Sequence, residues 1–302
     1  MWFLPSPLPG HDLATIVHHS IVDSSAVVFN ILLLIAVILR SPSSLRSYKV
    51  LLINSAIIDL LSSFTMLMSM VRIIPVRHVV AYVYDGPCAY VSGIFCHCLY
   101  TILLATLSQS LFLIALSFFY RLYILGRPSP SNKVMFLVCL IFSLPNLIIV
   151  VSEPILICKK RMRFRQRSCS HSMIRKCKVS TIIGHASIFN VKTMFTILAM
   201  TMPIGPTVIL ILIVRGKVLT KLSAHSVKMS DRTAKMHSTL TKVLTFQSML
   251  PIFFSGAVGS YALCQFDIVC SPVQEHFVFE CVSFMAFFAP MITLYCMIPY
   301  KE

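Results

Sequence analysis

Acidic side chains lie within long apolar stretches of this sequence, where a charge is costly. Asp59 stands in the middle of LLINSAIIDLLSS, and Asp23 and Glu280 stand in two other apolar stretches. A charged side chain at the centre of a membrane helix costs about 2.5–3.5 kcal/mol on insertion scales. Asp59 is therefore expected either to serve a function or to be a protonated carboxyl bonded to a neighbouring Ser or Asn. Asp23 and Glu280 lie toward one end of their stretches and are expected either to line a ligand cavity or to reach interfacial water.

Histidine and cysteine residues that resemble metal ligands occur next to one another, as CHC at Cys96–Cys98 and HH at His18–His19. Consecutive positions on a helix point in different directions, so no metal site and no cofactor are expected. An intramembrane enzyme would need a clustered nucleophile or metal set, and Asp59 and Asp23 show no matching histidine pair. The chain is predicted not to be an enzyme.

The elements that must position these residues are membrane helices. Of the 302 residues, 57% are hydrophobic and 12% are charged, which is too little charge to cover a soluble globule. A membrane helix needs roughly 20 apolar residues, and a spanning segment must satisfy its backbone groups internally. The predicted fold is an all-α, seven-transmembrane helix bundle in a single domain, 1–302, with spans at about 16–39, 50–74, 89–119, 134–151, 191–214, 243–262 and 277–298.

Basic residues next to the spans predict the orientation of the bundle. No Lys or Arg precedes the first span, whereas Arg40, Arg46 and Lys49 follow it. Cytoplasmic loops carry an excess of Lys and Arg, so the amino terminus is expected to be extracellular. The segment from Cys158 to Lys178 disagrees, because it carries nine Lys and Arg residues on the expected outer side. It is expected to steer anionic ligands toward the bundle, to contact anionic lipid or matrix, or to be an unselected variable loop.

Four short motifs narrow the function beyond the span pattern. GPC at Gly86–Cys88 opens the third span and SFFYRLYIL at Ser117–Leu125 closes it. MSDRTAKMHSTLTKVLTFQSMLPIFF runs from Met229 to Phe254, and the chain ends in APMITLYCMIPYKE. Together the motifs resemble those of the nematode seven-transmembrane chemoreceptors, and they are most similar to the serpentine receptor class D family. The resemblance covers nearly the whole chain.

The resemblance implies a G-protein-coupled, olfactory-type chemosensory receptor for a small environmental or pheromone-like ligand. Its expected partners are that ligand, a heterotrimeric G protein and the lipid bilayer, with no nucleic acid. The expected location is a multi-pass position in the plasma or ciliary membrane of a sensory neuron. The alternative is a seven-span channel or transporter, which should show a polar path or an internal repeat; the third, fourth and sixth spans contain no Asp, Glu, Lys or Arg.

Comparison with seven-span receptors also assigns roles to particular residues. At the inner face, the ends of the third and sixth spans are expected to form a pocket for a helix of the G-protein α subunit, at Tyr120, Arg121, Thr241 and Lys242. A conformational switch is expected at Asp59, Pro251, Pro290 and Tyr295. Each proline removes a helix hydrogen bond and is expected to act as a hinge or as a static kink.

A disulfide is expected at the outer face, where extracellular conditions permit one. Cys88 begins the third span, where many seven-span receptors anchor a disulfide to the loop between the fourth and fifth spans. The candidate partners in that loop are Cys158, Cys169 and Cys177. Cys177 is chosen because it is nearest the following span, and Cys264 and Cys270 could close a small loop of their own.

Overall fold

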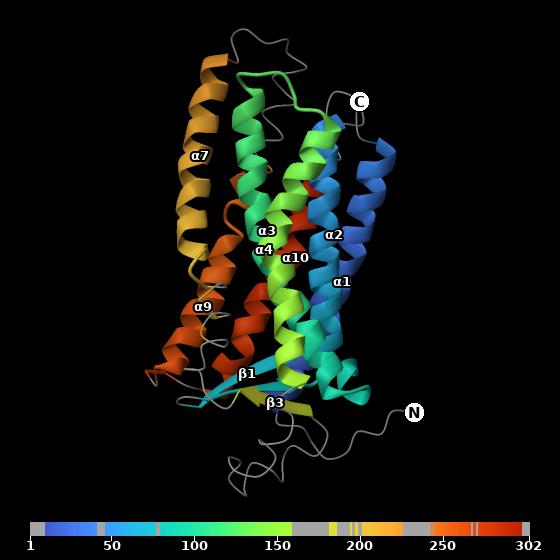
Figure 1. Cartoon of the computed structure of the whole chain (residues 1–302), viewed down its shortest axis with the longest axis vertical. Coiled ribbons are helices and arrows are strands. Elements are labelled where there is room, and N and C mark those ends of the chain that lie inside the picture. The colour runs from blue at the N-terminus through green and yellow to red at the C-terminus, as the bar shows by residue number, and fades with distance from the viewer. Residues whose placement is uncertain are drawn as a thin grey trace, which may run out of the picture.

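The computed structural model describes most of the chain as an elongated helical bundle (Figure 1). The described residues are 10–40, 46–76, 79–158, 181–185, 194, 197–198, 201–225, 243, 245–266, 268–269 and 271–297. Most of these residues lie in helices that run along the long axis of the bundle, while three short strands lie across one end. We call that end the sheet end. We call the opposite end, where α2 begins and α3 ends, the basic end.

The long helices are α1 (Gly10–Arg40), α2 (Arg46–Ser69), α3 (Gly93–Ile124), α4 (Asn132–Cys158), α7 (Ile204–His225), α9 (Pro251–Gln265) and α10 (Pro272–Met297). By length and composition, α1, α2, α3 and α10 are each able to cross a membrane. Each of the seven sequence ranges expected to span overlaps one of the long helices. Within the described residues, the chain is therefore mostly helical, with several apolar helices of membrane length.

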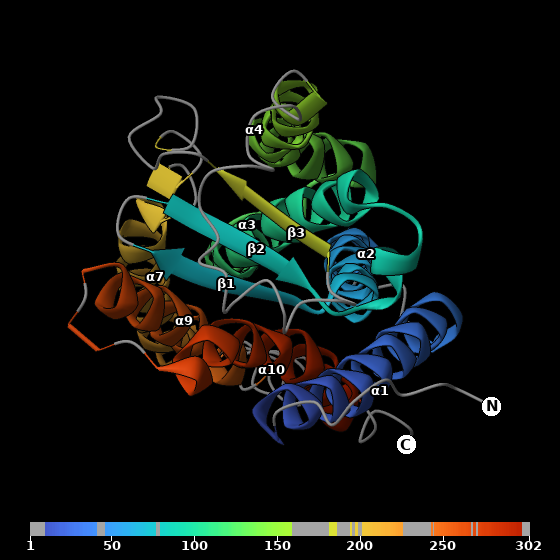
Figure 2. The same ribbon diagram turned by 90° about the horizontal axis from the view of Figure 1, so that it is seen from below.

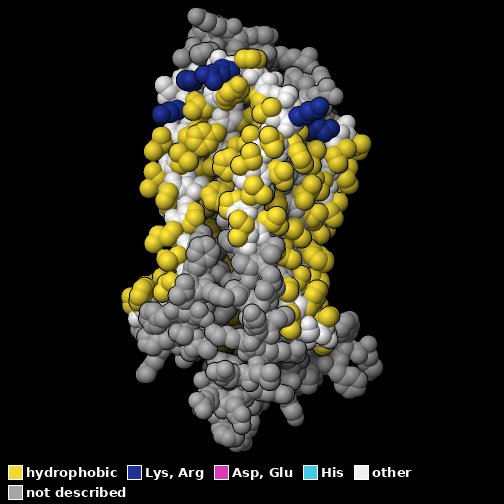
Figure 3. Space-filling view, viewed as in Figure 1, with side chains coloured by type: hydrophobic (Ala, Val, Ile, Leu, Met, Phe, Trp, Pro, Cys, Tyr) yellow, Lys and Arg dark blue, Asp and Glu magenta, His cyan; other side chains and the backbone are white. Residues whose placement is uncertain are grey.

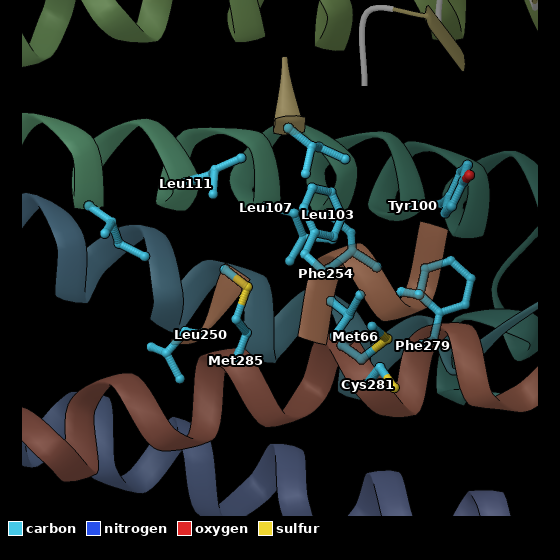
Figure 4. Close-up of a cluster of buried hydrophobic side chains, with 14 of the residues drawn as sticks. Met66, Tyr100, Leu103, Leu107, Leu111, Leu250, Phe254, Phe279, Cys281 and Met285 are labelled. Carbon is cyan, nitrogen blue, oxygen red and sulfur yellow. The ribbon is translucent and has the colours of Figure 1, made fainter. Parts of the chain in front are cut away.

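Helix α3 lies at the centre of the bundle. In its most apolar window 78% of the residues are buried, compared with 28% in α1. Leu103, Leu107 and Leu111 of α3 form one core cluster with Phe254 of α9 and Met285 of α10 (Figure 4). The outward faces of the helices carry exposed hydrophobic side chains instead (Figure 3). Such a surface suits a lipid solvent.

Hydrogen bonds between side chains join the helices at buried positions. The Gln109 amide of α3 donates to the Ser143 hydroxyl of α4 at 3.0 Å, and Asn146 of α4 donates to Gln109 Oε1 at 2.7 Å. Gln247, just before α9, donates to the Thr293 hydroxyl of α10 at 3.0 Å. Such bonds are worth about 0.6–2 kcal/mol each in membrane proteins, and their larger effect is to fix which faces of the helices meet.

The expectation of an all-α fold is incomplete, because a three-stranded antiparallel sheet covers one end of the bundle (Figure 2). Strands β1 (Val71–Val76) and β2 (Val79–Tyr84) form a hairpin in which Val71 opposes Tyr84, and β3 (Thr181–His185) pairs with β2. The hairpin sequences VRIIPV and VVAYVY are rich in β-branched residues and tyrosine, which favour strands. The second span was expected to continue to Ile74, but that part of it is β1.

Helix α2 ends at Ser69, and the backbone then turns sharply. Met70 has a φ of 38°, which is outside the range of right-handed helix, so the chain leaves the helix there and enters β1. After β2 the chain returns to the same place, where Gly86 N–H donates to the Ser69 carbonyl at 3.2 Å. A Cβ at Gly86 would overlap the backbone of Met68 and Ser69, so this close approach requires glycine.

The beginning of the third span also differs from expectation. Pro87–Tyr90 form a short 3-10 helix and α3 begins only at Gly93, where the Ser92 hydroxyl accepts a hydrogen bond from Phe95 N–H. The 3-10 turn brings Cys88 back against the first turn of α3. Cys88 is bonded to Cys96, with a Cα–Cα distance of 5.2 Å, which lies within the range that a disulfide requires.

The expected disulfide from Cys88 to Cys177 is therefore wrong, since the Cys88 sulfur is already bonded to Cys96. Among the three candidate partners in the loop, the side chain of Cys158 is not described, and Cys169 and Cys177 lie outside the described residues. Cys264 is disulfide-bonded, but Cys270 is outside the described residues, so the small loop expected between them stays a prediction. Sequence reasoning treated Cys96 only as a discounted metal ligand and missed its bond.

We expect replacement of either Cys88 or Cys96 by serine to destabilise the folded protein by about 2.5 kcal/mol, because the bond closes a loop of 8 residues. The double variant should lose no more than either single variant. Thermal denaturation of the purified protein measures the loss, and Cys98→Ser, which changes a nearby cysteine that forms no disulfide, is the control. Non-reducing peptide mapping that finds Cys88 joined to Cys177 would contradict the assignment.

Candidate functional site

A cavity of about 110 Å³ lies near the sheet end, inside the helix bundle. Helix α3 forms one wall, α9 and α10 form others, and the hairpin contributes Ile73 of β1 and Tyr82 of β2. The described side chains that line it are Ile73, Tyr82, His97, Tyr100, Thr101, Leu104, Leu107, Ile197, Thr201, Phe254, Ala257, Val258, Tyr261, Val278, Phe279 and Val282. Small-molecule sites in proteins are concave and mostly apolar, with a few polar groups, and this cavity fits that description.

Aromatic rings form the part of the cavity nearest the sheet. Tyr82 lies 4.8 Å from Tyr100 and 5.8 Å from His97, measured between ring centroids. Tyr100 also meets Phe279 of α10 edge to face at 6.2 Å, and these two rings point toward each other at one end of the core cluster (Figure 4). Rings from a strand and from two helices therefore meet at one place.

The polar groups of the cavity are hydroxyls and one imidazole. Tyr84 of β2 is fully buried, and its hydroxyl is 3.0 Å from His97 Nδ1. Burial raises the pKa of Tyr84 well above 10, so Tyr84 stays neutral and holds the imidazole ring through a hydrogen bond. The Thr101 hydroxyl donates to the His97 carbonyl at 2.9 Å, and the Tyr261 hydroxyl donates to Gln265 Oε1 at 3.0 Å.

Charged residues at the sheet end pair with one another outside this cavity. Arg72 of β1 lies 3.6 Å from the Glu275 carboxylate and 3.1 Å from His276 Nε2, measured from Nε and Nη1 respectively. Its neighbour Ile73 faces the cavity, as alternation along a strand requires. The contacts of Arg72 thus fasten the sheet to the start of α10 and add no charge to the cavity lining.

The two acids expected near a ligand, Asp23 and Glu280, lie at the contact between α1 and α10 and do not line the cavity. Asp23 Oδ2 is 2.8 Å from His19 Nδ1, and the Ser283 hydroxyl is 3.3 Å from the same nitrogen. Glu280 accepts a hydrogen bond from the Thr15 hydroxyl at 3.0 Å. His19 precedes Asp23 by one helical turn, and this spacing of four residues on α1 brings the two side chains together.

Asp59 is buried between α2 and α3, where the Ser110 hydroxyl donates to its carboxyl. Ser55, one turn earlier on α2, also bonds this carboxyl. A bond from the Asp59 carboxyl to a serine was one of the expectations, and such bonds are present to Ser55 on the same helix and to Ser110 on a different helix. A functional role of Asp59 stays a prediction. Asp59 therefore connects α2 to the central helix near the middle of the bundle.

Arg121 lies near the end of α3 at the basic end and is only 2% exposed. Its guanidinium carbon is 4.8 Å from the centre of the Tyr48 ring at the start of α2. Tyr120 stacks on the same Tyr48 ring, with 5.5 Å between the two ring centroids. Sequence reasoning selected Tyr120 and Arg121 but missed Tyr48. Thr241 and Lys242 lie outside the described residues.

The expected switch prolines occupy different environments. Pro251 is buried at the start of α9, and the bonds around it are of the i to i+3 type, such as Phe253 N–H to the Leu250 carbonyl at 3.0 Å. Pro290 lies inside α10 and lacks the N–H that would bond the Ala286 carbonyl. The Asn30 amide of α1 reaches that carbonyl at 3.4 Å. Tyr295 is 76% exposed and does not lie with them in the interior.

Cavity residues on α3 could have been found from their spacing, although His97 was considered only as a metal ligand and the others were not selected from the sequence. His97, Thr101 and Leu104 recur at the interval of one helix face, and Tyr100 lies beside them. In β2, Tyr82 and Tyr84 alternate with Ala81 and Val83. No group of three possible metal ligands occurs among the described residues.

Comparison with known proteins covers nearly the whole chain. Residues 15–302 match the family model described as "Serpentine type 7TM GPCR chemoreceptor Srd". The chain is similar to serpentine receptor class delta-3 of Caenorhabditis elegans, with 30% identity over 93% of this chain and 84% of the relative. It is also similar to serpentine receptor class delta-18 of the same organism, with 31% identity over 90% of this chain and 82% of the relative. The expected resemblance is confirmed, and the chain belongs to the Srd family of serpentine seven-transmembrane chemoreceptors.

Proposed function

We propose that this chain is a chemosensory receptor that binds a small molecule in the cavity and transmits the event to a heterotrimeric G protein. The observation that carries this proposal is the course of α3. Its first turns line the cavity with His97, Tyr100 and Thr101, and its last turn holds Arg121 against Tyr48. One central helix therefore joins a ligand-sized cavity to the opposite end of the bundle. Membership in a receptor family does not favour the channel or transporter alternative.

We propose further that seven helices cross the membrane, with the sheet end outside. Arg72 pairs with Glu275 at the start of α10 and Thr15 of α1 bonds Glu280, so both helices begin toward the sheet end. Lys and Arg side chains gather at the basic end on the face shown in Figure 3. Apart from Arg72, the described Lys and Arg side chains lie near the start of α2, near the end of α3, at the link from α3 to α4 or in the second half of α7: Lys49, Arg121, Arg127, Lys133, Arg215, Lys217 and Lys221. Positive charge marks the cytoplasmic side. The proposed location is the plasma or ciliary membrane of a sensory neuron.

Tyr48 and Arg121 are proposed to hold the resting state of the basic end. A buried guanidinium that faces an aromatic ring gains about 2 kcal/mol when both are desolvated. While Arg121 lies against Tyr48 it is inaccessible to a partner, and movement of α3 relative to α2 would release it. The released end, together with Tyr120, Thr241 and Lys242, would bind the terminal helix of a G-protein α subunit in a groove. Pro251 and Pro290 are proposed hinges for the accompanying motion of α9 and α10.

Asp59 is proposed to act in the same change of state. Its carboxyl joins α2 to α3 through Ser110, so any sliding of α3 must break or exchange that bond. A buried polar group that loses its partner costs about 1–3 kcal/mol. The bond therefore opposes small displacements of α3 and favours two distinct arrangements over a continuous drift.

Tyr48→Leu is expected to raise basal G-protein activation severalfold, because leucine fills the space but cannot hold the Arg121 guanidinium. Tyr48→Phe keeps the ring and should remain near the wild-type level. Basal nucleotide exchange in membranes, at matched surface expression, measures both and requires no known ligand. Tyr123→Leu is a matched control, since Arg127 lies over its ring at 5.7 Å in an exposed position.

Arg121→Ala should abolish the gain caused by Tyr48→Leu when the two changes are combined. The proposal requires this result because the released Arg121 is the group that contacts the G protein. A double variant with the same elevated basal activity as Tyr48→Leu alone would remove Arg121 from coupling.

Asp59→Asn is expected to preserve folding, because an amide oxygen can still accept from Ser110, but to reduce agonist-stimulated signalling at least fivefold. Ser110→Ala should instead lower the thermal midpoint, since it leaves the buried carboxyl without one donor. The response is measured in cells with an odorant found to activate the wild-type receptor. A normal response of Asp59→Asn at a normal surface level would end the switch role of this residue.

The orientation can be tested with epitope tags placed before Gly10 and after Ser129, which lies between α3 and α4. Antibody should stain the first tag on intact cells and the second only after permeabilisation. A tag after Arg167 in the basic segment should stain intact cells. Staining of the Arg167 tag only after permeabilisation would contradict seven crossings in this arrangement.

A further inference from the structure

The size of the cavity limits what it can hold. A dry apolar cavity of about 150 Å³ is large enough for benzene, and this cavity measures about 110 Å³. The two volumes are of the same order, so this cavity suits a molecule of about one ring or a short chain of comparable size. Growth of a ligand toward Tyr100, Phe254 or Phe279 would displace side chains of the packed core cluster.

The lining favours a flat apolar body. Phe254, Phe279 and Tyr100 present rings from three helices, and Tyr82 adds a fourth ring from the sheet. Aromatic rings prefer edge-to-face or offset contacts at centroid distances of about 4.5–7 Å. The rings of Tyr82, Tyr100 and Phe279 already meet in this range, and an aromatic ligand can extend the same packing.

The same lining disfavours a charged ligand. No Asp, Glu, Lys or Arg occurs among the described residues that border the cavity. The neighbouring charges at this end have their own contacts, Arg72 with Glu275 and Glu280 with Thr15. A carboxylate or an ammonium in this cavity would lose its hydration without gaining a counter-ion from these walls, whereas a neutral group would lose far less.

The directions of two hydrogen bonds select the type of polar group. A hydroxyl has one proton to donate and two lone pairs to accept with. Thr101 has given its proton to the His97 carbonyl, and Tyr261 has given its proton to Gln265. Both residues line the cavity, and each oxygen can take part in a further hydrogen bond only as an acceptor, so the best partner for them is a ligand that donates a proton.

We propose that the cavity selects a small, uncharged ring compound that carries a hydroxyl group, with Thr101 and Tyr261 accepting its proton. The signalling consequence of this binding rests on the receptor function proposed above, whereas the binding itself does not. The proposal also separates this cavity from the basic segment between Cys158 and Lys178, whose charge would suit anionic ligands. An alcohol needs no cationic partner at the site.

A matched series of one-ring probes tests the ligand class directly. Benzyl alcohol, toluene, benzoate and benzylamine share a ring and one carbon and differ in the polar group. Each is titrated against the full-length receptor purified in detergent, and the shift of the thermal midpoint is measured. Benzyl alcohol should stabilise the receptor at a half-maximal concentration at least tenfold below those of benzoate and benzylamine, with toluene between. Benzoate or benzylamine binding as tightly as benzyl alcohol would overturn the proposal.

Variants locate the binding and the polar contact. Ala257→Phe fills the cavity and should abolish stabilisation by every probe. Thr101→Val removes the acceptor at almost constant volume and should weaken benzyl alcohol threefold to tenfold while leaving toluene unchanged. Thr106→Val is the control, because Thr106 is a buried threonine of α3 whose hydroxyl bonds the Leu103 carbonyl at 2.8 Å and which does not border the cavity. Equal effects on benzyl alcohol and toluene would contradict the hydrogen bond.

Signalling assays distinguish failure of the ligand class from failure of the receptor function. If benzyl alcohol binds as expected but no bound probe activates any G protein in expressing cells, the receptor function is contradicted and the ligand class stands. If cells respond to a charged molecule, and Ala257→Phe abolishes that response, the cavity accepts a charged ligand, so the ligand class is overturned while the receptor function stands.

Discussion

Burial of α3 on nearly all sides is the constraint on which the rest of this structure depends. Lipid supplies no hydrogen bonds, so each polar side chain on the central helix must find a partner within its own helix or on a neighbouring helix. Gln109 finds Ser143 and Asn146 on α4, Ser110 finds Asp59 on α2, and Arg121 lies against Tyr48. The register of α3 against its neighbours is thus set by a few polar contacts, and the apolar contacts fill the space between them.

The same constraint is the basis of the signalling role proposed for α3. One end of the helix borders the cavity and the other holds a buried cation, so under that proposal a shift of α3 caused by a ligand at the first end would disturb the second. Packed interiors resist gradual deformation, and the bond between Asp59 and Ser110 adds a discrete contact that is either made or broken. Pro251 lies in α9 and Pro290 in α10. The Asn30 amide of α1 donates to the Ala286 carbonyl, which Pro290 leaves without its usual partner. Helix α1 therefore stabilises α10 at the point where Pro290 interrupts the helix hydrogen bonds.

The sheet end determines how the cavity is closed. The hairpin follows α2 directly, returns to it at Gly86 and is fastened to α10 by Arg72. The disulfide between Cys88 and Cys96 then ties the turn after the hairpin to the first turn of α3. Tyr82 and Tyr84 are held by these connections, and both meet His97. The polar character of the cavity thus comes from β2, from α3 beneath it and from Tyr261 of α9.

The sequence by itself determined the membrane setting, the places of the long helices and the family, because hydropathy and short motifs are local properties that survive in the linear order. It also selected Asp59, Tyr120 and Arg121, since polar groups in apolar stretches are visible without knowledge of their partners. Only the tertiary structure decided that Asp59 bonds Ser110, that Tyr48 covers Arg121, that Cys88 bonds Cys96 and that Asp23 and Glu280 lie away from the cavity. Those contacts depend on the rotation of each helix about its axis and on the turn of the chain at Met70, and many weak interactions across the bundle set both together.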